Sequence, residues 1–197
     1  QIINLLYNLV DRMYVGSIAG IGTDALAGLG VALPITLIVS AFSNLVGMGG
    51  APLASIFLGE KRGEKAERVF NTGAVLLVGF GVVLTAAVLL AGDPLLRLFG
   101  APDSSFGYAG DYLFVYGTGT VFVMLSLGLN PFITAQGYSI TSMATVAIGA
   151  VLNIGLDPLF IFVFGMGVKG AALATVLSQA VSALSRIVAM SFCEPRS

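Results

Sequence analysis

Residues 143–164 read MATVAIGAVLNIGLDPLFIFVF, an apolar run that contains one acidic residue, Asp157. The run is long enough to cross a bilayer as a helix, which needs about 20 apolar residues. A charge at the centre of such a helix costs ~2.5–3.5 kcal/mol on insertion scales, and acids there usually belong to an ion or proton pathway. The alternative is an acid near the helix end that reaches water or pairs with a neighbouring side chain. The segment therefore predicts a transmembrane helix that carries a candidate ion site.

Two neighbours of Asp157 favour the ion site. Asn153 lies four residues earlier, on the same face of a helix. Pro158 has no N–H and cannot donate to the carbonyl of residue 154, which leaves that oxygen available. Carboxylate, amide and carbonyl oxygens are the ligands that hard cations bind. We therefore expect this part of the helix to bind a cation, with Na⁺ as the metal candidate.

The composition of the whole chain agrees with a membrane location. The chain is 57% hydrophobic and 10% charged, with a mean hydropathy of +0.98, whereas soluble domains are about 45–50% apolar and about 25% charged. Its net charge of −1 offers no basic surface for nucleic acid. Because the chain has no histidine, proton transfer would depend on carboxylates. We expect an integral membrane protein with no nucleic-acid partner.

Apolar runs separated by short loops predict the helical spans. The spans are expected at about 1–16, 25–58, 67–91, 107–131, 139–164 and 168–190. Pro34 is expected to interrupt the second span and Asn130-Pro131 to end the fourth, because proline releases a backbone carbonyl. The chain starts at Gln1 inside a helical pattern, so we expect a piece of a longer protein. Residues 1–191 would form one bundle, and 192–197 its cytoplasmic end.

Basic residues are more frequent on one side of this predicted bundle. That side carries Lys61, Arg62, Lys65, Arg68, Arg186 and Arg196. The other side carries Arg12, Arg97 and Lys169. The positive-inside rule therefore predicts that the loop at 59–68 is cytoplasmic.

Polar residues recur at helical spacing in three of the spans. The first span carries Asn4, Tyr7, Asn8 and Asp11; the fifth carries Thr145, Gly149, Asn153 and Asp157; the sixth carries Ala171, Thr175, Ser178, Gln179 and Ser182. Such stripes face protein or a water-filled cavity, although close helix packing would also explain the small residues of the sixth span.

At ~1.5 Å per residue, the acids of the first and fifth spans lie at similar depths. If these helices are neighbours, the two acids share one pocket. In the alternative, Asp11 pairs with Arg12, although adjacent residues on a helix do not face each other.

Four short motifs of the chain resemble those of a known family of membrane proteins. LVDRMYVG at 9–16 and DALAG at 24–28 resemble the first-helix signature of the multidrug and toxic compound extrusion (MATE) family. LNIGLDPLFI at 152–161 and GMGVKGAALAT at 165–175 resemble its fifth and sixth helices. The order and spacing match along the whole chain, which looks most like the bacterial small-drug exporters. The resemblance implies an all-α polytopic membrane protein, in which this chain is the N-terminal six-helix lobe of a twelve-helix transporter.

The resemblance also implies a function and the residues that perform it. The implied activity is Na⁺- or H⁺-coupled antiport, exporting organic and often cationic compounds across the bacterial plasma membrane. No enzymatic activity and no cofactor are expected. The implied partners are these small organic compounds, membrane lipids and a C-terminal lobe that the sequence lacks. The implied cation ligands are Asp11, Asn153, Asp157 and Thr175, and the implied cavity-lining residues are Tyr7 and Asn130.

Three other functions are compatible with a polytopic helical chain. A flippase for lipid-linked oligosaccharides has a related fold, but it needs a basic cavity, and Arg12 is the one basic residue expected to reach it. A half-size transporter would dimerise to replace the second lobe. An intramembrane aspartyl protease would need a Gly-x-Gly-Asp motif, which none of the 10 acidic residues provides.

Overall fold

The computed structural model describes residues 2–192, with side chains described for 9–189. Every regular element in 2–192 is helical, which confirms the all-α class. The elements are α1 (Ile2–Gly16), α2 (Gly22–Gly59), α3 (Gly63–Leu98), α4 (Asp103–Thr118), α5 (Thr120–Ala135), α6 (Ser139–Pro158), the π-helical turn η1 (Leu159–Val163) and α7 (Val168–Phe192).

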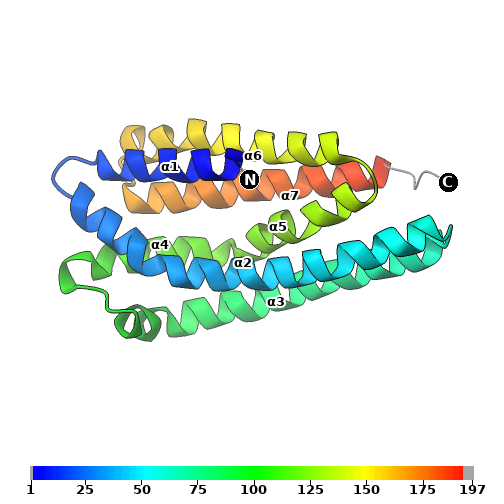
Figure 1. The fold of residues 1–197 in the computed structure, drawn as a ribbon. Helices are drawn as coiled ribbons and strands as arrows, with labels where there is room; N and C mark the ends of the chain where they lie inside the picture. Colours follow the sequence, from blue (N-terminus) through cyan, green and yellow to red (C-terminus); the bar gives the residue numbers. More distant parts are fainter. Residues whose placement is uncertain (1, 193–197) are drawn as a thin grey trace.

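The helices form two layers that α4 and α5 connect (Figure 1). Helices α1, α6 and α7 lie together in one layer, and α2 and α3 form the other. Both α4 and α5 pack against α2, α3 and α7. Accordingly, most of the largest fully buried apolar side chains belong to α3, α4 and α5: Leu77, Leu113, Met124, Leu129, Ile133 and Phe132. The α4–α5 segment is thus the centre of the bundle, and it sets the spacing between the two layers.

The outer faces of the bundle are apolar. Four helical stretches are long and apolar enough to cross a membrane, and the bent pair α4–α5 raises the number to up to 5 within the described residues. Leu90 is 85% exposed and Val75 is 71% exposed, both on α3. Exposed side chains of this kind suit a helix that contacts lipid tails. The predicted multi-pass membrane fold is therefore confirmed, although α1, with 15 residues, is shorter than a complete span.

The fourth span is broken, which the sequence did not predict. It runs from Asp103 to Ala135 and bends by 62° at Gly119. A Cβ atom on Gly119 would lie 2.3 Å from Cγ1 of Val176 on α7, so only glycine permits this close approach. The prediction that Asn130-Pro131 ends the span is wrong, because Pro131 lies inside α5.

Helices α2 and α3 are also longer and more regular than expected. The prediction that Pro34 interrupts the second span is wrong, because α2 continues through both Pro34 and Pro52. Helix α3 extends to Leu98 rather than ending near 91.

The fifth span changes helix type directly after Asp157. Helix α6 ends at Pro158, and the chain continues as the π-helical turn η1. Proline removes a donor from the regular ladder, and single π turns often occur at functional sites. The start of α7 packs tightly against this turn, since a Cβ on Gly170 would lie 2.8 Å from the carbonyl carbon of Phe160. This contact brings the first turns of α7 next to the end of α6.

Candidate cation site and its neighbouring cavity

Asp157, Asn153 and Thr175 meet where α6 and α7 pack together. Asp157 has no exposed surface and Asn153 is 3% exposed. Asn153 Nδ2 donates a hydrogen bond to Asp157 Oδ1 at 3.3 Å and a longer one to Thr175 Oγ1 at 3.5 Å. One amide group therefore orients a carboxylate on its own helix and a hydroxyl on the next helix.

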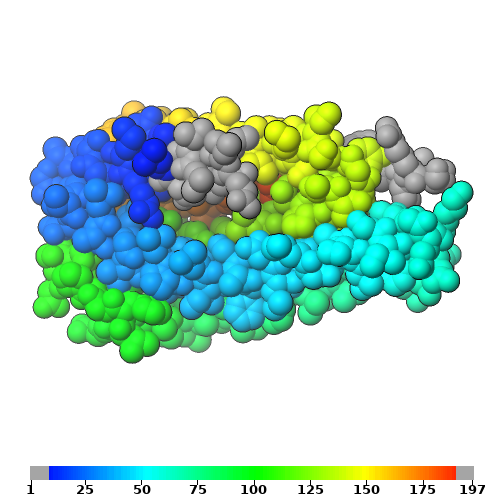
Figure 2. Space-filling view, viewed as in Figure 1, coloured from blue at the N-terminus to red at the C-terminus, as the bar shows by residue number. Residues whose placement is uncertain are grey.

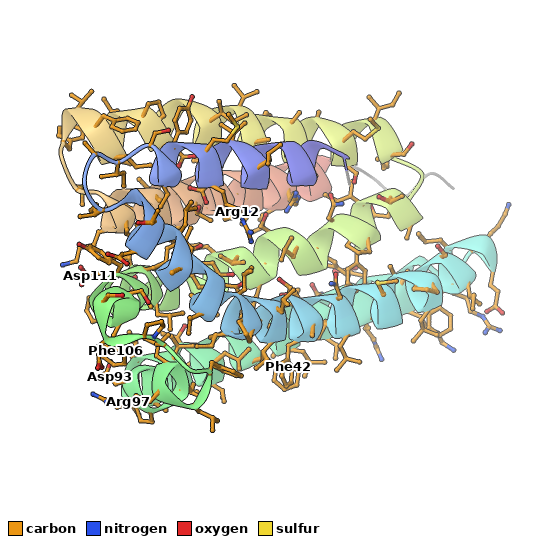
Figure 3. All side chains as sticks on the ribbon, turned by 60° about the vertical axis from the view of Figure 1, so that its left-hand side comes forward. Arg12, Phe42, Asp93, Arg97, Phe106 and Asp111 are labelled. Carbon is orange, nitrogen blue, oxygen red and sulfur yellow. The ribbon has the colours of Figure 1, made fainter. Side chains whose placement is uncertain are left out.

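Helix α1 brings a second acid to this place. Asp11 is 7% exposed, and α1 packs against α6. If both carboxylates, of Asp11 and Asp157, are ionised, their charges repel each other. Asp11 and Arg12 form no ion pair with each other in the described part of the chain. Arg12 is exposed and extends from α1 towards the side of α5 (Figure 3).

Three oxygen atoms of this cluster have no hydrogen-bond donor among the described residues. They are Asp11 Oδ1, Asn153 Oδ1 and Asp157 Oδ2, and all three are buried. A buried acceptor without a partner costs about 1–3 kcal/mol. The arrangement therefore suits a positively charged ligand that these oxygens can share, such as a hard cation or a proton. Among the described residues, no three or more His, Cys, Asp or Glu side chains are grouped so that they could hold a metal ion, so the arrangement does not resemble a transition-metal site.

A cavity of about 270 Å³ adjoins the carboxylate cluster. Helices α5, α6 and α7 form its walls, together with part of α2. Figure 2 shows the surface hollowed beside α2, with atoms of α5 and α7 visible inside the hollow. Asn153 and Thr175 border both the cavity and the carboxylate cluster. The polar side chains that line the cavity are Asn44, Ser126, Asn130, Asn153, Thr175, Ser178, Gln179, Ser182 and Arg186.

Asn130, an expected cavity residue, does line this cavity. Its Oδ1 accepts a hydrogen bond from Ser142 Oγ at 2.8 Å, and Ser142 Oγ accepts one from Thr134 Oγ1 at 3.0 Å. The network ties α5 to the first turn of α6. The other expected cavity residue, Tyr7, has a side chain outside the described residues.

Arg186 is the site residue that the sequence analysis missed. It was counted among the basic residues at the end of the last span, but it is 3% exposed inside the bundle. Its Nε donates to Thr145 Oγ1 at 3.2 Å, and its Nη1 donates to the backbone oxygen and the hydroxyl of Ser126. Arg186 thus links α7 to both α5 and α6.

The sequence did contain a signal for this position. Arg186 lies four residues after Ser182 and eight after Ser178, so it continues the polar stripe of the last span. Because Arg186 is buried, it no longer counts among the basic residues that predict the orientation of the protein in the membrane. That prediction now depends mainly on the basic residues of the loop at 59–68. The expectation that Arg12 alone could reach a cavity is also wrong.

Comparison with known proteins gives the family. A family model described as MatE matches residues 1–159. The chain belongs to this family of membrane transporters. The Multidrug export protein MepA of Staphylococcus haemolyticus is 29% identical over 188 residues, which cover 95% of this chain and 41% of that protein.

Two further relatives agree in sequence and in fold. The Probable multidrug resistance protein YpnP of Bacillus subtilis is 32% identical over 182 residues, covering 90% of this chain and 40% of that protein. A solved structure, described as the inward-facing conformation of a multidrug resistance MATE family transporter of the MOP superfamily, matches with a TM-score of 0.89 and 31% identity. The match covers 98% of this chain and 43% of that chain. The chain therefore spans about two fifths of the length of these relatives.

Proposed function

We propose that this chain is the N-terminal, ion-binding lobe of an exporter that moves organic compounds out of the cell. In this proposal, Na⁺ or H⁺ enters the cell through the same protein and drives the export. The family, and the names of the relatives as multidrug export and resistance proteins, support export as the activity. The support for ion coupling comes from the geometry of the candidate cation site.

The observation that carries the ion coupling is the set of unpaired buried oxygens of Asp11, Asn153 and Asp157. A cation bound between them would satisfy all three oxygens and would remove the repulsion between the two carboxylates. Thr175 Oγ1, held by Asn153 Nδ2, would be a further oxygen ligand. A proton shared by the carboxylates would have the same electrostatic effect.

The available driving force is sufficient for export. Each charge that moves inward yields about 2.3 kcal/mol per 100 mV of membrane potential. A tenfold concentration gradient of either ion adds about 1.4 kcal/mol. One or two ions per cycle therefore support an export gradient of ten- to a thousandfold.

The position of Asp11 suggests how ion binding changes the lobe. Asp11 lies on α1 and Asp157 on α6, so their repulsion favours separation of the two helices. Ion binding would draw α1 towards α6 and would change how α1 packs in this layer of the lobe. The exporter would then alternate between an ion-bound and a compound-bound lobe.

The remaining parts of the proposal concern the whole protein. A second six-helix lobe would complete the path for the exported compound, and a second copy of this chain could replace that lobe in a half-size transporter. The Staphylococcus and Bacillus relatives support a bacterial plasma membrane location, and the basic loop at 59–68 would face the cytoplasm.

A sodium titration at several pH values tests the ion site. We expect purified full-length protein to bind Na⁺ in calorimetry, with an apparent affinity that weakens as the pH falls, because protons compete for the same oxygens. A transporter that uses protons alone would show no sodium binding but would export in response to a pH gradient. The absence of sodium binding, together with export that responds to neither ion gradient, would contradict the proposal.

A further inference from the structure

A second hollow lies between α2 and α3, separate from the cavity beside the cation site. It is a groove with a volume of about 510 Å³, and it shares no lining residue with that cavity. Its walls are mostly apolar and include Leu45 and Leu53 of α2 and Leu76 and Phe80 of α3. The two helices lie side by side in one layer of the bundle (Figure 1). Because the three leucines are exposed, the groove opens to the outside of the lobe.

Glycine residues give the groove its depth. Gly49, Gly50 and Gly73 all line it. A Cβ atom on Gly50 would lie 2.5 Å from Cζ of Phe132, and one on Gly73 would lie 3.0 Å from the same atom, so α5 closes the groove behind these two positions. A Cβ atom on Gly49 would meet nothing within 4 Å. A narrow, flexible apolar chain can therefore lie against the backbone of α2 at Gly49.

One end of the groove carries a positive charge. Arg68 is exposed, and it is the only charged residue among the lining residues that the structure describes. It forms no ion pair with a described residue, although Glu64 lies one helical turn before it and Glu67 is adjacent. Thr72, one turn after Arg68, lines the groove as well. A guanidinium group beside a hydroxyl suits a phosphate group, which guanidinium binds through two parallel hydrogen bonds.

Arg68 lies at the depth expected for a lipid headgroup. Residues 69–92 contain no charged side chain. As a helix this segment is about 36 Å long, compared with about 30 Å for the hydrocarbon core of a bilayer, which places Arg68 at its boundary. Along α3, the lining residues extend from Arg68 to Phe80, a distance of about 18 Å, which is close to the depth of one leaflet. The groove therefore has the length of an acyl chain and a charged group at its headgroup end.

We propose that the groove between α2 and α3 binds an anionic phospholipid, with an acyl chain against Gly49 and the phosphate against Arg68. An apolar protein surface fits less well, because it would bury the guanidinium group without a partner. Lys61 and Lys65, close to Arg68 in the chain, add positive charge that attracts anionic headgroups. The lipid belongs to the leaflet that adjoins the loop at 59–68. The inference is independent of the ion coupling, since the groove and the cation site share no residue.

Two lipids with the same acyl chains and different headgroups test the proposal. Purified full-length protein in detergent is mixed with equal amounts of dioleoyl phosphatidylglycerol, which is anionic, and dioleoyl phosphatidylcholine, which has no net charge. Native mass spectrometry measures the lipid that stays bound. We expect the wild type to retain the anionic lipid about tenfold more than the neutral one, as a charge-assisted hydrogen bond predicts.

Two variants with matched controls assign this retention to the groove. Arg68→Gln should abolish the preference for the anionic lipid, whereas Arg97→Gln should keep it, because Arg97 lies over the ring of Phe106 at 4.9 Å, at the other end of α3 (Figure 3). Gly49→Leu should fill the groove without a clash inside the lobe and should lower retention of both lipids. Gly30→Leu is its control, because a Cβ there also meets nothing within 4 Å but Gly30 does not line the groove. It should retain lipid as the wild type does.

Contrary results identify other occupants of the groove. Equal retention of the two lipids by the wild type, or a preference that survives in Arg68→Gln, would refute the proposal. Displacement of bound phosphatidylglycerol by inorganic phosphate would indicate a site for soluble anions instead. If Gly49→Leu retains both lipids but melts at a lower temperature than Gly30→Leu, then another part of the protein or a second copy covers the groove, and the lipid site is refuted.

Discussion

The substitution Asp157→Asn tests the ion site most directly. It keeps the size of the side chain but removes one of the two charges that would hold a cation, and an amide N–H replaces an unpaired carboxylate oxygen. A monovalent cation about 4 Å from the charge of a carboxylate gains about 4 kcal/mol at an effective dielectric constant near 20. Because 1.4 kcal/mol is tenfold in affinity, we expect cation binding to weaken about a thousandfold.

The effect of Asp157→Asn on ion-driven export is measured with the full-length protein in proteoliposomes. The wild type should export a fluorescent compound when a sodium or a proton gradient is imposed. Asp157→Asn should respond to neither gradient. The control is Asp111→Asn, because the Asp111 side chain is half-buried and pairs with Lys169 at 3.2 Å, away from the carboxylate cluster (Figure 3). This control variant should export as the wild type does.

Thermal unfolding separates lost binding from lost folding. A ligand present at a hundred times its dissociation constant stabilises the folded state by about 2.7 kcal/mol. If sodium is the ion, the wild type should melt at a higher temperature in sodium chloride than in choline chloride, and Asp157→Asn should show no difference. Since the substitution also removes the repulsion from Asp11, the ion-free variant should be at least as stable as the ion-free wild type. Undiminished ion-driven export by a well-folded Asp157→Asn protein would refute the assignment.

Two other substitutions test the geometry of the site and of the bend. Asn153→Ala removes the donor to Asp157 Oδ1 and should weaken cation binding about tenfold, less than the loss of the carboxylate; unchanged binding in calorimetry would mean that the amide is not a ligand. Gly119→Ala places a Cβ 2.3 Å from Val176 Cγ1 and should lower the free energy of unfolding by about 1–3 kcal/mol. Gly79→Ala is its control, because a Cβ there meets nothing within 4 Å, and it should leave stability unchanged or raise it slightly; equal melting temperatures for the two variants would contradict the explanation of the bend.

The sequence was most informative where the relevant spacing lies within one helix. The four-residue interval between Asn153 and Asp157 predicted a shared face, and the structure joins the two side chains by a hydrogen bond. The burial of Thr145 and Gly149 on the same face follows from the same periodicity. The pairing with Thr175 was harder to predict, because it depends on how α7 packs against α6.

Arg186 shows the limit of sequence reasoning about charged residues. A basic residue near the end of a predicted span is normally interpreted as a residue that faces water and orients the protein. The polar stripe on its helix pointed to the interior instead. A basic residue can be buried only where other helices supply hydrogen-bond acceptors for it. The acceptors of Arg186 are on Ser126 and Thr145, which are 60 and 41 residues away in the chain, so the sequence around Arg186 does not reveal them.

The sequence by itself determined the apolar spans, the all-helical class and the polar face of each span, because hydropathy and helical periodicity are local properties. Tertiary structure decided which faces meet. The contact of α1 with α6 brings Asp11 close to Asp157, and the bend at Gly119 depends on Val176 of another helix. These features arise from close approach between residues that are distant in the chain. Both acids could therefore be named from the sequence, whereas the contact between α1 and α6 that brings them together, and the burial of Arg186, came from the structure.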